Sequence, residues 1–205
     1  MQDAQGRPVT GRVRWRKFAV LAVPGFAATA ALAVALAQGA LAASFAVSGQ
    51  QFKISADSLD GKGFAQYGGV DVNAHDELIP VAVTSIKQAE LKKLCQSVVM
   101  RLPILGAVSL NLHAGGSKPV QATDLFLDAT QMSGDAEFTN IEIGRDASTL
   151  DKGPEGAQGM TDVFAQQADR IQMTNVHQTA WATNAGSFRL NGLDLKVLKG
   201  ERECF

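Results

Sequence analysis

The chain has 205 residues, of which 46% are hydrophobic, and its formal net charge at pH 7 is −1. A charge balance this close to zero gives no indication of a nucleic-acid partner. The two cysteines, Cys95 and Cys204, are too few and too far apart for a CxxC redox motif or a zinc cluster. The charges are unevenly distributed along the chain, and this asymmetry indicates a membrane protein.

Residues 1–17 form a basic tail. They contain five positive side chains and one negative side chain, a net charge of +4, so the rest of the chain carries −5. Residues 18–52 contain no charged side chain, and the apolar stretch 18–37 has about the twenty residues that a helix needs to cross a bilayer. Because positively charged flanks remain in the cytoplasm, we expect a cytoplasmic tail and an extracytoplasmic remainder.

Two fates are open to the apolar segment. Residues 40–42, Ala-Leu-Ala, match a signal-peptide cleavage site, so the domain would be secreted if the chain were cut after Ala42. Signal peptides have apolar regions of only about 7–15 residues, however, and the greater length here favours a retained signal anchor. We therefore expect a tail over residues 1–17, a single transmembrane anchor over 18–43 and an extracytoplasmic domain over 44–205.

The two cysteines of this domain are 109 positions apart. In an exported protein, a small even number of cysteines indicates a disulfide. A bond between Cys95 and Cys204 would hold the C-terminus against the body of the domain. Two free thiols and a bridge between chains are the alternatives.

Most of the domain is predicted to consist of strands separated by turns. Apolar and polar residues alternate, as expected of half-buried strands, over residues 108–114, 125–129, 139–143, 188–190 and 193–197. The alternation slips by one residue at Asn191-Gly192, which predicts a β-bulge at Gly192. Residues 152–159, KGPEGAQG, form a polar loop that we expect to be disordered.

Residues 86–101 support two interpretations. Leu91, Leu94, Val98 and Leu102 have helical spacing, and Pro103 would end such a helix, so the local pattern favours a helix. The alternative is a strand, because Ala-Glu-Leu at 89–91 repeats a short phrase. Similar phrases, each beginning with alanine and ending in leucine or isoleucine, occur at 56–59, 122–125 and 168–171. We interpret them as a weak internal repeat of strand pairs.

The phrase FKISADSLDG at 52–61 and the Ala-Asp-x-Ile phrase at 168–171 resemble repeats of the lipopolysaccharide-transport periplasmic proteins. That resemblance implies an open curved sheet, folded like a taco, whose apolar interior holds acyl chains. Over most of its length the chain also resembles an uncharacterised family of actinobacterial membrane-anchored exported proteins. The matching features are the basic tail, AASFAVSGQQFKISAD, GFAQYGG, LCQSVV and the terminal ECF. Members sometimes carry an automatically transferred "cholesterol esterase" label, but the resemblance implies no mechanism.

The sequence gives little support to an esterase. The Gly-x-Ser-x-Gly turn that carries the nucleophile of an α/β-hydrolase is absent. His75, His113 and His177 could each act as a base in a triad on another fold, but positions in turns or on the polar side of a strand explain them better. Asp71, His75, Asp76 and Glu77 form an oxygen-rich group without the spacing of a known calcium loop. We therefore expect no catalytic residues, no metal and no cofactor.

The sequence thus predicts a mainly β domain with a curved, taco-shaped or solenoid-like sheet behind a transmembrane helix. We expect it to bind a hydrophobic molecule, most plausibly a lipid, without catalysis. The alternatives are a structural or interaction module that pairs with itself or with a membrane protein, and a lipid esterase. The residues expected to line the ligand site are the inward members of the strands: Ile54, Leu110, Leu112, Leu125, Leu127, Ile141, Ile143, Phe188 and Leu190.

Overall fold

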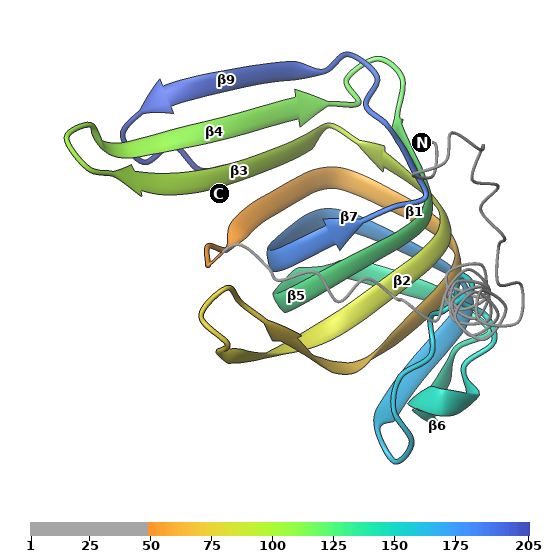
Figure 1. Ribbon diagram of the computed structural model, residues 1–205. Coiled ribbons are helices and arrows are strands. Elements are labelled where there is room, and N and C mark those ends of the chain that lie inside the picture. The colour runs from red at the N-terminus through yellow and green to blue at the C-terminus, as the bar shows by residue number, and fades with distance from the viewer. Residues whose placement is uncertain (1–48) are drawn as a thin grey trace, which may run out of the picture. The chain divides into compact units, whose positions relative to one another are not determined.

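The computed structural model describes residues 49–205, so the predicted tail, anchor and cleavage site lie outside the described residues. Residues 49–205 form an antiparallel β domain, which confirms the prediction of a mainly β fold (Figure 1). Its elements are β1 (Phe52–Val72), β2 (Leu78–Lys92), β3 (Leu94–Leu102), β4 (Gly106–Ala114), β5 (Val120–Thr139), β6 (Glu142–Asp146), the 3₁₀ turn η1 (Ala147–Thr149), β7 (Phe164–Asn184), β8 (Ser187–Arg189) and β9 (Asp194–Lys199). Within this part of the chain, no helix is long and apolar enough to span a membrane.

The four longest strands pair in a closed ring. β1 pairs with β2 on one side and with β7 on the other, and β5 pairs with both β2 and β7. Each ring strand therefore has two ring neighbours, and the sheet curves until it encloses its own apolar face. The main hydrophobic cluster, which includes Leu59, Ile86, Leu125 and Ile171, fills this interior.

The long strands bend at residues that adopt left-handed backbone conformations. Gly63 in β1, Asp124 in β5 and Asn175 in β7 all have positive φ angles, of 69°, 49° and 54°. Such residues interrupt the regular ladder and increase its local twist, as β-bulges do. Gly63 is also sterically required, because a Cβ atom there would lie 2.7 Å from the carbonyl oxygen of Lys152. Because of these bends, a ring of as few as four strands can surround a core.

A second layer of three strands extends from the ring. β3 pairs with the first residues of β1 through Lys53–Ser97 and Ser55–Cys95, and β4 and β9 continue the sheet outward. In Figure 1 this β3–β4–β9 layer lies above the ring and projects to the left. The hairpin between β3 and β4, residues 103–105, forms its free tip.

The C-terminal tail crosses the outer face of this layer. The Ser109 hydroxyl donates to the carbonyl oxygen of Gly200 at 2.7 Å and accepts from the Arg202 amide at 2.7 Å. The Cys204 amide donates to the Ser97 hydroxyl at 3.0 Å, and Cys204 forms a disulfide with Cys95. The predicted intramolecular disulfide is therefore confirmed, and it holds the chain end against β3.

The prediction of a helix over residues 86–101 is wrong. These residues belong to β2 and β3, which are separated by Lys93 with a φ of 48°. Leu91 and Leu94 both face the interior because the turn at Lys93 adds an extra residue between them. A strand break of this kind produces the spacing of three residues that otherwise indicates a helix.

The structure also corrects two loop predictions. Instead of forming a bulge in one strand, Gly192 lies in a turn where the chain leaves β8, paired with β5, and enters β9, paired with β4. Residues 152–159 are ordered: Ala157 is buried in a second cluster with Ala65 and Leu150. A Cβ atom at Gly153 would lie 2.9 Å from that of Ala65, so glycine permits this close packing.

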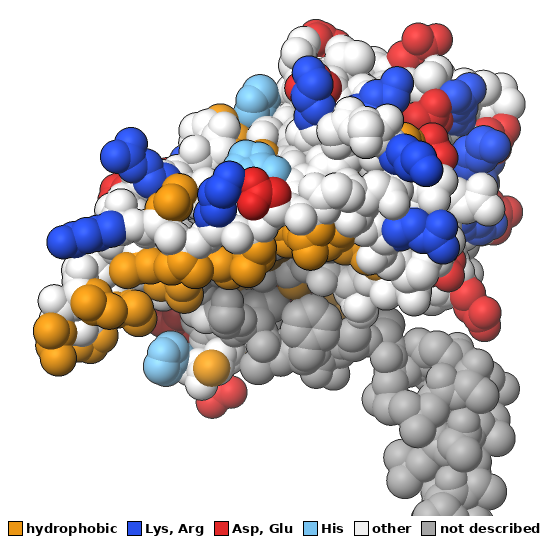
Figure 2. Space-filling model, turned by 90° about the horizontal axis from the view of Figure 1, so that it is seen from above, with side chains coloured by type: hydrophobic (Ala, Val, Ile, Leu, Met, Phe, Trp, Pro, Cys, Tyr) orange, Lys and Arg blue, Asp and Glu red, His pale blue; other side chains and the backbone are white. Residues whose placement is uncertain are grey.

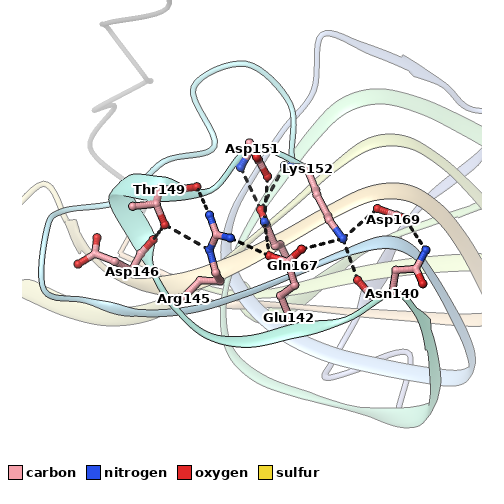
Figure 3. Close-up of polar contacts among 9 residues, drawn as sticks. All are labelled: Asn140, Glu142, Arg145, Asp146, Thr149, Asp151, Lys152, Gln167 and Asp169. Atoms are coloured by element: carbon pink, nitrogen blue, oxygen red, sulfur yellow. Dashed lines mark hydrogen bonds and ion pairs between the residues drawn. The ribbon is translucent and has the colours of Figure 1, made fainter.

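A buried glutamine secures the same loop (Figure 3). Gln167 in β7 is fully buried, and its carbonyl oxygen accepts hydrogen bonds from the amides of Asp151 and Lys152 at 2.9 and 3.1 Å. Its amide nitrogen donates to the carboxylates of Glu142 and Asp151, both at 2.9 Å. The hydrogen bond from Gln167 and the nearby Lys152 ammonium lower the pKa of Glu142.

Candidate functional site

The interior of the ring contains a small apolar cavity. Its volume is about 40 Å³, which is room for about three water molecules. The lining is almost entirely aliphatic, with one aromatic ring at its margin, and the apolar residues are Ile54, Leu59, Ile86, Leu91, Leu94, Leu125, Leu127, Met132, Ile171, Met173, Val176 and Phe188. Because a complete acyl chain does not fit in this volume, a long ligand would need a continuation of the cavity outside the ring.

The short repeated phrase supplies one segment of each ring strand. Its alanines, at positions 56, 89, 122 and 168, are all buried in β1, β2, β5 and β7. The leucine or isoleucine that ends each phrase lines the cavity: Leu59, Leu91, Leu125 and Ile171. The weak repeat thus corresponds to the wall of the cavity.

Four uncharged polar side chains interrupt this apolar lining: Thr84, Gln96, Gln178 and Thr183. Gln96 in β3 and Gln178 in β7 both pair with Ile54, so the two amides flank that residue on the inner face. Thr183 also lines the cavity, and its buried hydroxyl oxygen has no hydrogen-bond partner among the described residues. A few hydrogen-bonding groups in an otherwise apolar pocket are typical of a small-molecule site.

The apolar lining continues onto the inner face of the β3–β4–β9 layer. Leu94 and Gln96 of β3 line the cavity, and the following residues on the same face, Val98 and Met100, are half-buried. The register then aligns Leu110 of β4 with both Val98 and Val197. Figure 2 shows hydrophobic side chains in a band that runs along this layer to its free end at the left. This face adjoins the cavity. We call the part of it formed by Val98, Met100, Leu110 and Val197 the apolar ramp.

The structure separates the predicted lining residues into three groups. Ile54, Leu125, Leu127 and Phe188 line the cavity. Leu112 and Leu190 pack against the main cluster, and Leu110 lies on the ramp. Ile143 in β6 and Ile141, which directly precedes β6, are exposed and do not line the cavity. Prediction missed Leu59, Leu91 and Ile171, although the repeated phrase contained the signal that would have found them.

A polar groove of about 530 Å³ lies on the outer face of the ring. Asp60 and Arg170 form an ion pair in it, and the Arg170 hydrogen bond lowers the pKa of Asp60. Lys62 and Arg189 contribute two further cations to its lining. The groove is open, and its lining contains both positive and negative side chains. Such a lining is typical of a solvent-exposed sheet face.

The three histidines lie in separate places. His75 is in the β1–β2 hairpin, His113 lies beside the Cys95 sulfur at 3.9 Å, and the His177 ring contacts the Phe205 ring at 4.7 Å between centroids. Among the described residues, no hydrogen bond joins a serine hydroxyl to a histidine ring. No group of three or more potential metal ligands is present in this part of the chain. The three histidines therefore do not form one cluster in the described part of the chain.

Asp128 provides a test of the electrostatics of the outer face. Burial and the neighbouring Asp71 carboxylate raise the pKa of Asp128 from 3.8 to about 6. The folded state therefore loses stability as pH rises through 6, because the unfolded chain ionises this group at lower cost. We expect Asp128→Asn to raise the free energy of unfolding at pH 7.5 by about 1 kcal/mol, after allowance for solvent screening.

This gain should disappear at pH 4, where the wild-type carboxyl is protonated. Urea denaturation at the two pH values measures the difference, with Asp124→Asn on the same strand as control. A gain of equal size at both pH values would contradict the assignment of the raised pKa to Asp128.

The structure defines a class of protein: an antiparallel β domain whose long strands close around an apolar cavity that opens onto an apolar sheet face. The chain belongs to DUF6230, a family of unknown function, whose profile matches residues 48–205. The expectation of an uncharacterised family is confirmed at that level. Neither a curated protein nor a solved structure matches the chain.

Proposed function

We propose that this protein is a membrane-tethered extracytoplasmic domain that binds a hydrophobic molecule, most plausibly a lipid, without catalysing a reaction. The observation that carries the proposal is the continuity of the apolar cavity with the inner face of the β3–β4–β9 layer. Exposed apolar surface of this extent on a sheet face is typical of an interaction site.

The dimensions of the site determine how a ligand would lie. The cavity of about 40 Å³ accommodates the end of an apolar chain, and the remainder would lie along the ramp past Val98, Leu110 and Val197. Each square ångström of apolar surface removed from water contributes about 25 cal/mol, so a ligand that covered the ramp would bind mainly through burial. Such binding does not require hydrogen bonds or ion pairs between the ramp and the ligand.

The polar groups of the cavity favour an uncharged ligand group. Gln96, Gln178 and Thr183 can donate or accept hydrogen bonds, and no charged residue lines the cavity. A buried ionised head group without an opposite charge would be strongly unfavourable there. The ligand class that fits best is a neutral amphiphile with a hydroxyl or carbonyl group.

Two features of the sequence support the membrane tether. The uncharged run of residues 18–52 ends where β1 begins, so the apolar segment and the domain are joined by a short connection. The resemblance to actinobacterial membrane-anchored exported proteins supports the same arrangement. The phrases that resemble lipopolysaccharide-transport repeats lie in the ring strands, whose inner faces form the cavity wall.

One observation favours a second candidate function, assembly at the cell surface. Among residues 49–205, β9 pairs only with β4 and all its residues are exposed, so no strand of this part of the chain occupies its second edge. An edge strand with apolar side chains can accept a strand from a second copy or from a membrane protein. Such pairing would use main-chain groups of β9, whereas a lipid would use the inward side chains.

Lipid extraction from the domain tests the first proposal. The strand ladders, the core and the disulfide described above all lie within residues 49–205, so residues 44–205 can be produced as a domain in an export-competent host. We expect mass spectrometry of an organic extract to find stoichiometric lipid in the wild type. Val197→Asp, on the ramp and 67% exposed, should lose most of it.

Leu198→Asp is the matched control, since Leu198 lies on the opposite face of the same strand. It should retain the lipid. Equal loss from both variants would indicate that the edge of β9 matters more than its inner face, which would favour assembly. Absence of lipid from the wild type would contradict the proposed function.

A further inference from the structure

The tip of the β3–β4–β9 layer consists of apolar residues that no other residue of the described range 49–205 covers. Leu102 and Gly106 close the hairpin, and Pro103, Ile104 and Leu105 form its turn. Ile104 is fully exposed and Leu105 is 63% exposed. Large apolar side chains at the end of a projecting hairpin contribute nothing to the core, so their presence requires another explanation.

The backbone at the tip makes this choice of residue more unusual. Ile104 has a φ of 80°, in the left-handed region. β-branched residues are rarely found there, and turns of this kind normally use glycine, asparagine or aspartate. Strained residues of this type often occur at functional sites. The isoleucine is therefore unfavourable for the turn and needs a role that its side chain performs outside the fold.

The tip points to the side from which the chain enters the domain. Lys53 pairs with Ser97, so β3 continues to Leu102 beyond the first residue of β1. In Figure 1 the start of β1 and the tip both lie at the left. Only eight residues, 44–51, separate the expected anchor from β1, and they can span at most about 29 Å. A tether of this length would hold the tip within reach of the bilayer.

The neighbouring charges distinguish this tip from the other exposed apolar groups. The charged residues nearest in the ladders are Arg101 on β3 and Lys199, opposite Val108. Arg101 forms an ion pair with Glu201 at 2.7 Å, so the excess charge beside the tip is the positive charge of Lys199. By contrast, the β1–β2 hairpin with its exposed Leu78 carries the carboxylates of Asp71, Asp76 and Glu77. Apolar side chains beside an excess of positive charge suit a lipid interface, whereas an excess of carboxylates does not.

We infer that the tip formed by Leu102, Ile104 and Leu105 inserts into the outer surface of the bilayer and connects it to the apolar ramp. The partner is a lipid surface, and the tip gives a lipid molecule a path to the ramp that avoids water. This inference extends the proposed function. It rests on that function for the claim that a lipid molecule moves from the bilayer to the ramp. The contact of the tip with the bilayer is a separate, measurable property.

The experiment uses the full chain reconstituted into liposomes that contain brominated phosphatidylcholine. In Ile104→Trp we expect the added tryptophan to fluoresce at shorter wavelength and to be quenched severalfold more than in the control Ile143→Trp. Ile143 is a good match because it is 66% exposed and lies in β6, which does not belong to the β3–β4–β9 layer. The unsubstituted protein, measured in the same liposomes, gives the background fluorescence of the two native tryptophans.

A second variant separates folding from membrane contact. Ile104→Asn should unfold at the same temperature as the wild type or a higher one, because asparagine tolerates the left-handed backbone. In liposomes, its tip amides should exchange with deuterium faster than those of the wild type. Both results would support insertion of the tip.

An unquenched tryptophan at 104, or stronger quenching at 143, would overturn the inference. Concentration-dependent crosslinking at 104 without quenching would assign the tip to a second copy and would also overturn it. Retained lipid in the extracts with no quenching at 104 would leave the proposed function standing. Quenching at 104 with no lipid in the extracts would support the tip and contradict the proposed ligand.

Discussion

Replacement of both Cys95 and Cys204 by alanine is expected to lower the free energy of unfolding by about 4–5 kcal/mol, because the disulfide closes a very long loop. The two residues are 109 positions apart, so the bond removes much of the conformational freedom of the unfolded chain. The variant would also release the C-terminal tail from Ser97 and Ser109. Denaturation in urea, monitored by circular dichroism, measures the total loss.

Ser97→Ala separates the tail contact from the covalent loop. It removes the hydrogen bond from the Cys204 amide and leaves the disulfide in place, so the expected loss is only about 1 kcal/mol. If the double cysteine variant were no less stable than Ser97→Ala, the loop-closure explanation would be wrong. The tail would then act only through its local contacts.

Gln167→Leu is expected to lower the free energy of unfolding by about 3–4 kcal/mol, because it leaves buried amides without acceptors. The amides of Asp151 and Lys152 lose the glutamine carbonyl oxygen, and leucine offers Glu142 no donor. Hydrogen exchange should therefore increase first in the loop between η1 and β7. Urea denaturation and exchange mass spectrometry measure the two effects.

Gln172→Leu on the same strand is the matched control. Gln172 is exposed, and its amide reaches Asp60 only at 3.4 Å, so we expect a change of less than about 0.5 kcal/mol. If Gln167→Leu were as mild as this control, the loop would be held by its apolar cluster and not by the glutamine. Exchange in the loop would then be unchanged as well.

The strand content of the fold could be predicted from residue patterns, but its closure could not. Alternation identified β4 and the first half of β5 because these strands are half-buried with a period of two. It also identified β9, although all residues of that strand are exposed. The repeated alanine phrase marked one segment of each ring strand. Pairing between β1 and β7 depends on bends at residues such as Gly63 and Asn175. A sequence pattern shows such residues but does not show which distant strands they bring together.

The failures have a common physical origin in irregular backbone. Lys93 inserts one residue between Leu91 and Leu94, so two strands imitated a helix. Gly192 permits a change of pairing partner where a bulge was expected. The loop 152–159 is polar in composition, yet it is ordered by Gln167, which is remote in sequence. Local composition carries no information about such a partner.

The residue pattern also predicted part of the candidate site correctly. Ile54, Leu125, Leu127 and Phe188 line the cavity, because inward alternation was assigned correctly in those strands. Ile141 and Ile143 alternate equally well, but Ile143 lies in β6 at the edge of the sheet beside β7, Ile141 directly precedes that strand, and both are exposed. Alternation identifies a face of a strand, and only the tertiary structure determines whether that face is covered.

The pairing of β1 with β7 also determines when the domain can be completed as the chain is made. Asp60 and Gln172 lie on paired strands and are 112 residues apart. In a chain synthesised from its N-terminus, β1 therefore exists long before its partner does. Contacts of such long sequence separation slow folding, and a waiting strand exposes an edge that can associate with other chains. The closed ring gives the finished domain its core. During synthesis, however, the unpaired edge of β1 must be kept from associating with other chains until β7 has been made.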